Sequence, residues 1–247
     1  MTSAASSLGA VRRGIFTDVN IKLPSVPWSL RDVLLGIVFV ALGVVLVRVL
    51  LFDDRSLIAI DRNFANTIGI FLIESLLFLA VLLFAVRKYD IRWHALGVHQ
   101  EYKASDYWLV AAVIVAILLA NAAYATLVSY MGLKDLEPPG VPTTLVGTGA
   151  FRFFNVMIIG VWGPMAEELF FRGFVLPALV PRFKLGGAIA ISSALFAISH
   201  GSFAVAVPIF VSGMLLAWLY VKSKSLWPSI GAHSVQNLLA LAFAGYL

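Results

Sequence analysis

The sequence lacks cysteine altogether and is poor in charge. None of its 247 residues is cysteine, which excludes a disulfide framework and a thiolate metal site. Charged residues make up 13% of the chain and hydrophobic residues 61%, whereas soluble domains have about 25% and about 45–50%. Both departures predict an all-α fold, namely a polytopic helical membrane protein. The formal charge of +5 is attributed to cytoplasmic loops, so no nucleic-acid partner is expected.

Long hydrophobic runs are what the chain has in quantity. About 20 residues cross a bilayer as a helix, so we expect about seven transmembrane helices, with room for an eighth, short helix at 141–150 or 174–182. The seven expected spans are 31–52, 66–86, 107–131, 150–172, 186–202, 203–221 and 226–246.

Polar segments divide the chain into three parts. Residues 1–29 contain no apolar signal-peptide core, which predicts a cytoplasmic N-terminal tail. The loop 131–144 separates N-terminal transmembrane helices (30–144) from a C-terminal transmembrane core (145–247). Almost all the polar groups inside the spans follow this loop, so we expect the catalytic residues to lie in the C-terminal core.

Lysine and arginine are unevenly distributed between the two membrane faces. Their numbers near successive faces are four, three, four, two, three, none, two and none. Because cytoplasmic loops carry the excess of positive charge, this pattern predicts a cytoplasmic N-terminus and an outer C-terminus. We expect an integral protein of a bacterial inner or plasma membrane, with a site reached from the cytoplasmic side.

Ionisable residues inside the spans are concentrated in three short motifs. These are EELFFR at 167–172, FAISH at 196–200 and HSVQN at 233–237. Such groups are costly within a bilayer and usually mark a functional site. Glu74 is the one deep charge of the first half. It has no partner in the sequence, and we assign it no catalytic role.

Helical spacing shows which of these side chains share a face. Residues four apart lie on one face, so Glu168 and Arg172 can pair while Glu167 points about 100° away and is left free. His233 and Asn237 are also four apart, and the histidine of the second motif adds a third helix. A carboxylate and a histidine can take a proton from water, and a histidine and an asparagine can donate hydrogen bonds to an oxyanion. The set therefore suits hydrolysis by an activated water.

The patterns EExxxR, FxxxH and HxxxN, in this order on separate membrane helices, resemble the CPBP family. These are the CAAX-processing and bacteriocin-processing intramembrane endopeptidases, also called Abi proteins, and the type II CAAX prenyl endopeptidases are their best understood branch. The resemblance covers about residues 145–243. It implies cleavage of a peptide bond in a membrane-associated or lipidated peptide or protein, within membrane lipid. It also implies a structural or substrate-positioning role for Glu168 and Arg172.

The resemblance further implies roles for the other four motif residues. Glu167 would activate the water with the assistance of His200. His233 and Asn237 would bind the oxyanion. Two functions outside this family stay open, namely a proton-coupled transporter, which also uses intramembrane carboxylates and histidines, and a non-catalytic immunity or binding protein on the same scaffold.

Zinc is the alternative to a metal-independent site. Glu167, His200 and His233 could supply the two histidines and one carboxylate of a hydrolytic zinc centre. An HExxH pattern is absent, and Asn237 beside His233 suits an oxyanion site better. No cofactor is therefore favoured.

The depth of His200 in the membrane conflicts with this assembly. If the fifth span begins near Gly186, His200 lies about 20 Å along it at about 1.5 Å per residue. Glu167 and His233 are expected nearer the cytoplasmic face. The three side chains can meet only if the fifth helix is tilted, begins deeper or is broken.

Overall fold

The computed structural model describes residues 23, 25–52, 61–98 and 104–247, with the side chains of 104–106 excepted. Most of the tail expected at 1–29 lies outside these ranges, as do parts of the loops at 53–60 and 99–103. Within the described ranges every regular element is helical, which confirms the predicted fold class.

The N-terminal half contains three long helices and two short turns. They are α1 (Leu30–Phe52), α2 (Arg62–Val81) with its continuation η1 (Leu82–Arg87), η2 (Trp93–Leu96), α3 (Ala104–Tyr130) and η3 (Lys134–Leu136). The C-terminal half follows with a series of connected helical segments. They are α4 (Thr143–Val146), α5 (Ala150–Met157), η4 (Ile158–Trp162), α6 (Gly163–Glu168), η5 (Leu169–Val175), α7 (Leu176–Ser199), α8 (Phe203–Ser223) and α9 (Leu226–Phe243).

Five helical stretches of the described chain are long and apolar enough to cross a membrane. They are Leu30–Phe52, Arg62–Arg87, Tyr107–Tyr130, Ala150–Ser199 and Phe203–Ser223. The fourth stretch is 50 residues long and contains two of the expected spans. Helix α9, expected as the seventh span, is not among the five, because polar residues of the HSVQN motif interrupt it. The short α4 lies at the first of the two places predicted for an extra helix.

The long stretch bends at Lys184, and the bend resolves the depth conflict. The fourth span was expected to end near Arg172 or to continue toward Pro177, and the helix continues further, through Leu176 to Lys184, which has φ 57° and ψ 172°. From Glu167 to Lys184 is 17 positions, and from Lys184 to His200 is 16. The two limbs are nearly equal in length, so His200 returns to the level of Glu167.

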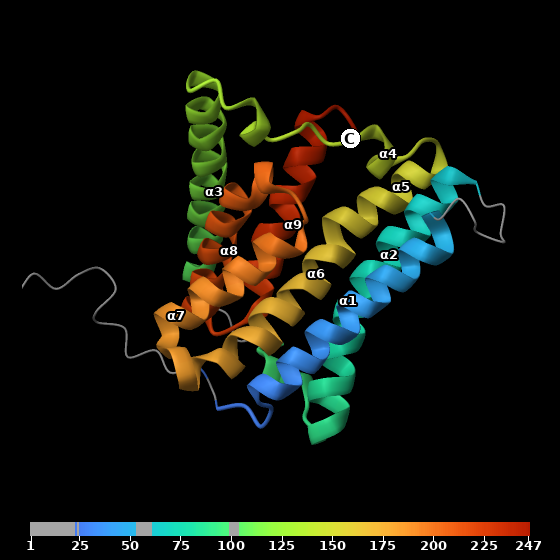
Figure 1. Cartoon of the computed structure of the whole chain (residues 1–247). Coiled ribbons are helices and arrows are strands. Elements are labelled where there is room, and N and C mark those ends of the chain that lie inside the picture. The colour runs from blue at the N-terminus through green and yellow to red at the C-terminus, as the bar shows by residue number, and fades with distance from the viewer. Residues whose placement is uncertain (1–22, 24, 53–60, 99–103) are drawn as a thin grey trace, which may run out of the picture.

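The segment from α5 to the first limb of α7 is a central rod between two groups of helices (Figure 1). Helices α1 and α2 pack on each other, and α2 contacts α5, η4 and α6. On the other side α9 contacts η4 and α6, while α3 covers α8 and α9. The rod therefore carries its polar residues where both groups of helices meet.

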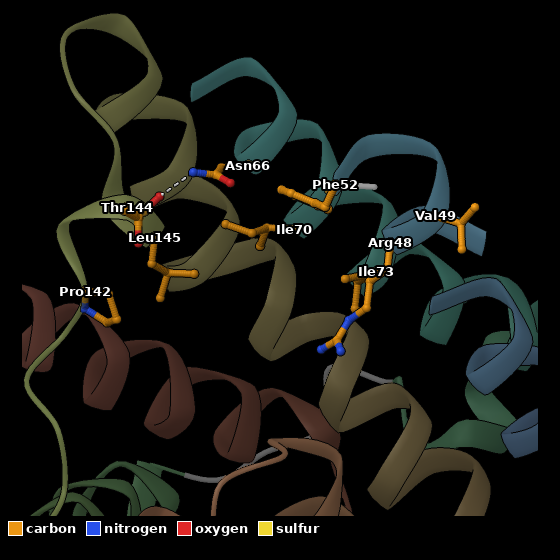
Figure 2. Close-up of a pocket in the computed structure, with 10 residues that line it drawn as sticks. Arg48, Val49, Phe52, Asn66, Ile70, Ile73, Pro142, Thr144 and Leu145 are labelled. Carbon is orange, nitrogen blue, oxygen red and sulfur yellow. Dashed lines mark hydrogen bonds between the residues drawn. The ribbon is translucent and has the colours of Figure 1, made fainter. Parts of the chain in front are cut away.

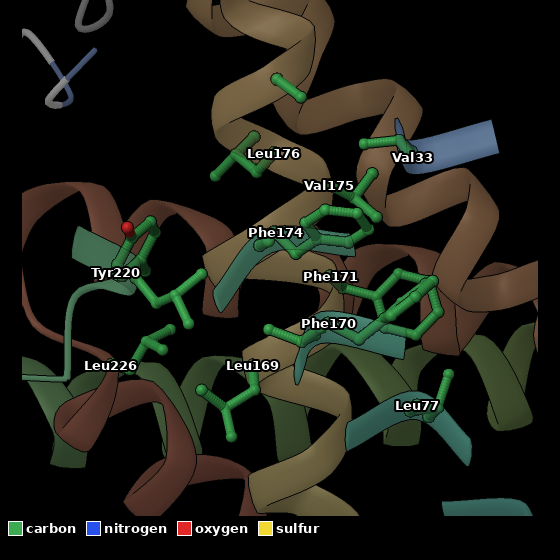
Figure 3. Close-up of a cluster of buried hydrophobic side chains, with 14 of the residues drawn as sticks. Val33, Leu77, Leu169, Phe170, Phe171, Phe174, Val175, Leu176, Tyr220 and Leu226 are labelled. Carbon is green, nitrogen blue, oxygen red and sulfur yellow. The ribbon is translucent and has the colours of Figure 1, made fainter. Parts of the chain in front are cut away.

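A buried aromatic cluster fixes the rod immediately after Glu168 (Figure 3). Phe170, Phe171 and Phe174 are all at most 3% exposed and lie in the main core. Trp28 packs on Phe174 and donates its indole N–H to the Phe174 carbonyl at 2.8 Å. Between helices in a bilayer such rings stabilise the fold by close van der Waals packing rather than by removal from water. The cluster therefore holds the carboxylates in a defined position.

A polar cluster joins the start of α1 to the end of η1. Asp32 accepts hydrogen bonds from the backbone N–H and hydroxyl of Ser29 at 2.8 and 2.9 Å and from the Tyr89 hydroxyl at 2.8 Å. Lys88 donates to the other carboxylate oxygen of Asp32. This hydrogen bond raises the pKa of Lys88. The cluster fixes the two helices that form one wall of the cavity described below.

Candidate active site

Two π-helical turns, η4 and η5, flank the short helix α6 that carries the paired glutamates. A π-turn inserts an extra residue into a helix and often occurs at functional sites. Each one changes the direction of the side chains that follow it. Four-residue spacing therefore describes neighbouring side chains, such as Glu168 and Arg172, better than side chains separated by a whole π-turn.

The predicted pair of Glu168 and Arg172 is present and fully buried. Arg172 Nη1 lies 2.9 Å from Glu168 Oε1, and both side chains are 0% exposed. Arg172 Nη2 also donates to the Gly213 carbonyl at 3.0 Å, and the guanidinium lies 4.5 Å from the centre of the Phe196 ring. The arginine thus connects α6–η5 to α7 and α8. A buried charge of this kind is tolerated only with such partners.

His233 contacts both glutamates, which the sequence did not predict. Its Nδ1 lies 3.1 Å from Glu168 Oε1, and its Nε2 lies 3.4 Å from Glu167 Oε2. The ring is almost completely buried, and its contact with Phe196 is edge-to-face at 5.7 Å between centres. Glu168 therefore orients His233 as well as pairing with arginine. A carboxylate that is hydrogen-bonded to one ring nitrogen of a histidine fixes the orientation of that ring.

His200 approaches Glu167 from the end of α7. Its Nδ1 lies 2.9 Å from the Phe196 carbonyl oxygen. Because a carbonyl can only accept, Nδ1 carries the hydrogen, and Nε2 of the neutral ring is left as an acceptor. Nε2 lies 4.0 Å from Glu167 Oε1. This distance is too long for a direct hydrogen bond and suits a single bridging water.

Asn237 lies beside the same group and is partly engaged by the backbone. Its Nδ2 donates to the Ile159 carbonyl in η4 at 2.9 Å. One N–H of the amide is therefore used to hold α9 against the central rod. The second N–H and the amide oxygen remain for a ligand.

All four predicted catalytic residues line one cavity of about 530 Å³. Glu167, His200, His233 and Asn237 are joined there by Glu74 from α2. The sequence offered no partner for Glu74, and the structure places it in this cavity. Nothing local to its sequence could reveal the contact, because its neighbours come from helices more than 80 positions later in the chain. The useful signal was that it is the one deep charge of the first half.

A second hollow of about 650 Å³ adjoins the catalytic cavity (Figure 2). Arg48 from α1 faces it, and Asn66 donates a hydrogen bond to the Thr144 carbonyl at its rim at 3.0 Å. The two spaces share Ile70, Ile73 and Leu145 as lining residues. The catalytic cavity therefore adjoins a space that opens between α1, α2 and α4.

The histidine and carboxylate side chains of the cavity also bear on the zinc alternative. The described ranges contain no group of three or more histidine, cysteine, aspartate or glutamate side chains arranged to hold a metal ion. His233 has both ring nitrogens directed at glutamates, and His200 has one nitrogen on a backbone carbonyl. With no such group of ligands among the described residues, no step through a metal is derived below.

Comparison with known families gives the second line of evidence. Residues 148–239 match the family model described as "Type II CAAX prenyl endopeptidase Rce1-like". This segment is similar to that family, and we refer to it as the Rce1-like domain. The match confirms the resemblance inferred from the three motifs, and its limits lie close to the predicted 145–243. The Rce1-like domain begins just before α5 and ends within α9.

Two bacterial relatives are similar to part of the chain. "Putative membrane peptidase YdiL" of Bacillus subtilis (strain 168) is 30% identical over 82 residues, or 33% of this chain and 34% of that protein. "UPF0177 protein YxdF" of Lactococcus lactis subsp. lactis (strain IL1403) is 33% identical over 82 residues, or 33% of this chain and 45% of that protein. The matched segment covers less than half the length of either relative. No solved structure shows significant similarity to the chain.

Proposed function

We propose that this protein is an intramembrane endopeptidase that hydrolyses a peptide bond of a membrane-associated or lipidated protein. The observation that carries the proposal is the position of Glu167 between two histidines in a cavity surrounded by apolar helices. The Rce1-like domain contains all the residues of this group except Glu74. Apolar walls from α1 and α2 suit a substrate that enters from lipid.

The proposed reaction begins with a water held between Glu167 and Nε2 of His200. Glu167 takes one proton of the water as its oxygen attacks the carbonyl carbon of the substrate. The tetrahedral intermediate collapses when the bond to nitrogen breaks and Glu167 returns the proton to the leaving amine. The products are a carboxylic acid and an amine, so atoms and charge balance. Neither a serine nor a cysteine nucleophile is required.

The proposed step requires an ionised Glu167, and positive charge close to it would favour that form. Glu167 and Glu168 are opposed by Arg172 and, when it carries two protons, by His233. A doubly protonated His233 donates from Nδ1 to Glu168 and presents Nε2–H on the side of Glu167. The same N–H, with the free N–H of Asn237, can then stabilise the oxyanion after attack. The sequence interpretation assigned the support of Glu167 to His200, but His233 lies closer to it.

The excess of lysine and arginine on alternate faces supports access from the cytoplasmic side of a bacterial inner or plasma membrane. The products and substrate would then exchange on the side where the N-terminus lies. A transporter remains the competing function, since carboxylates and histidines also form proton relays.

Glu167→Gln tests the proposal because glutamine keeps the size of the side chain and cannot take a proton. We expect the purified wild-type protein in detergent to cleave a prenylated CAAX peptide or its unprenylated twin, and Glu167→Gln to lose nearly all cleavage while retaining the wild-type unfolding temperature. Glu137→Gln, at an exposed loop position, is the matched control and should cleave normally. Ion flux through liposomes without cleavage of either peptide would instead support a transporter.

A further inference from the structure

Glu74 is the member of the cavity for which the proposed mechanism has no use. It comes from α2, outside the Rce1-like domain. The charges that act on it are those of Glu167 and His233. One of its carboxyl oxygens, Oε2, is buried and has no hydrogen-bond partner in the described part of the protein. Leaving such an atom unpaired costs about 1–3 kcal/mol, so its retention needs a reason.

Contacts on both sides of Glu74 fix α2 against the central rod. The Trp162 indole N–H donates to the Ser75 hydroxyl at 3.2 Å, and the same ring stacks on Phe71 at 6.0 Å between centres. The carboxyl group itself lies against Gly163, where an added Cβ would be 3.4 Å from Glu74 Cδ. Glu74 is therefore held in place rather than free to turn toward lipid.

The carboxyl group and the Asn237 amide lie along the same stretch of the central rod. Ile159, Gly163 and Glu167 of the central rod all face this cavity. Glu74 lies against the middle one of the three, and Asn237 is bonded to the first. The acid from α2 and the amide from α9 are thus placed on opposite helices around the same stretch of the rod.

The charges in the cavity require Glu74 to be neutral. The two glutamates of α6 already face one permanent cation, Arg172, with the His233 ring between them. The lining contains no lysine or arginine among the described residues, and Arg48 faces the adjoining hollow instead. An additional unpaired carboxylate beside Glu167 would be strongly disfavoured in this apolar surrounding. A neutral carboxylic acid is a hydrogen-bond donor, and such acids serve as oxyanion donors in enzymes.

We propose that Glu74 is a further catalytic residue, a neutral carboxylic acid that donates a hydrogen bond to the substrate carbonyl oxygen beside Asn237. The inference rests on the proposed peptidase function. The proton stays on Glu74 throughout, so the residue stabilises the oxyanion without changing the balance of the reaction. It compensates for the N–H of Asn237 that is already used on Ile159.

Two substitutions at this position separate the donor role from charge and from packing. Glutamine keeps the shape and an N–H donor, whereas methionine keeps the length and removes the donor. We expect Glu74→Gln to retain cleavage within about 10-fold of wild type and Glu74→Met to lower kcat by about 100-fold or more, as the loss of an oxyanion donor does. Leu72→Met, on the exposed face of the same helix, is the control and should change neither kcat nor KM.

Two outcomes of the kinetics overturn the inference. Full activity of Glu74→Met would show that the donor is unnecessary, and equal loss in Glu74→Gln and Glu74→Met would show that an ionised carboxylate is required. In either case an active wild-type protein leaves the proposed function standing. A wild-type protein that cleaves neither peptide is a failure of the proposed function itself.

An infrared measurement tests the neutral acid without relying on activity. The purified wild-type protein should show the C=O stretching band of a protonated carboxylic acid at neutral pH. Glu74→Gln should remove intensity from this band in the wild-type protein and also in the Glu167→Gln variant, so that the lost signal is assigned to Glu74 and not to Glu167. A band that Glu74→Gln does not alter would overturn the inference whatever the kinetics show.

Discussion

The side chain of Arg172 is charged and fully buried, and its contacts hold several residues of the site in position. It pairs with Glu168, donates to the Gly213 carbonyl and lies over Phe196. Glu168 in turn orients His233. The arginine is therefore linked to His233 through Glu168.

Replacing Arg172 by methionine should strongly destabilise the protein. Glu168 would lose its cationic partner inside an apolar core, and breaking a buried pair from one side costs about 3–5 kcal/mol. At about 2–4 °C per kcal/mol for a chain of this size, the unfolding temperature in detergent should fall on the order of 10 °C. Arg182→Met, at an exposed position, should leave it nearly unchanged. Equal effects of both substitutions would show that the buried pair contributes nothing special.

His200 and Asn237 should differ in how much activity their loss removes. His200→Ala removes an acceptor for the water and should abolish cleavage. Asn237→Ala or Asn237→Asp removes one donor to the oxyanion and should reduce kcat by about 10²–10³-fold, or about 2.7–4 kcal/mol, leaving measurable turnover. Steady-state kinetics on one peptide decides between them, with the exposed Val235→Ala of α9 as the control. Complete inactivity of both Asn237 variants would assign that residue a larger role.

Contacts within a motif could be predicted from the sequence, and contacts between helices could not. The Glu168–Arg172 pair follows from helical spacing alone. The contact of His233 with Glu168, and the place of Glu74 in the cavity, depend on how helices far apart in the chain pack together. Spacing along one helix contains no information on that packing.

The helices were predictable from the lengths of the apolar runs in the sequence. The π-turns and the exact form of the bend within the longest helical stretch were not. The expected spans at 31–52, 107–131 and 203–221 agree closely with α1, α3 and α8. The expected spans at 150–172 and 186–202 placed a break between them, and the structure has it as a bend at Lys184 within one continuous stretch rather than as a loop. The π-turns were missed because no side-chain pattern in the sequence marks the extra residue.

Close packing of α7 on α8 should depend on the absence of a side chain at Gly213. An added Cβ would lie 3.1 Å from Ser193 Cβ, 3.3 Å from Ser193 Cα and 3.2 Å from Phe196 Cδ1. Gly213→Val should therefore destabilise the protein by about 1–3 kcal/mol through overpacking. It should also reduce cleavage, because the Phe196 carbonyl holds His200 and the Gly213 carbonyl holds Arg172.

Gly186→Val is the matched control for this packing effect. It lies in the second limb of α7, the helix that packs on α8, and an added Cβ there meets nothing within 4 Å. Both variants carry the same change in helix propensity, so the difference in their unfolding temperatures measures the clash alone. Indistinguishable unfolding temperatures would show that α7 and α8 can separate without cost.

The orientation of the whole molecule can be tested because the chain has no cysteine of its own. Lys222 lies at the end of α8 on the face predicted to be cytoplasmic, and Asp135 lies in the loop after α3 on the opposite face, and both are exposed. An impermeant thiol reagent should label Asp135→Cys in cells whose outer barrier has been opened, and should label Lys222→Cys only after lysis. The reverse pattern would invert the topology and place the active site's entrance outside.

The sharing of one cavity between α2 and the Rce1-like domain has a consequence for biosynthesis. The chain is made from its N-terminus, so α1 and α2 reach the bilayer before the rod that carries two glutamates and an arginine. Alone in lipid that rod would be costly to insert. Its polar face instead meets a helix that is already in place, with Glu74 pointing toward it. We therefore expect α1 and α2 to lower the cost of inserting the segment that carries Glu167, Glu168 and Arg172.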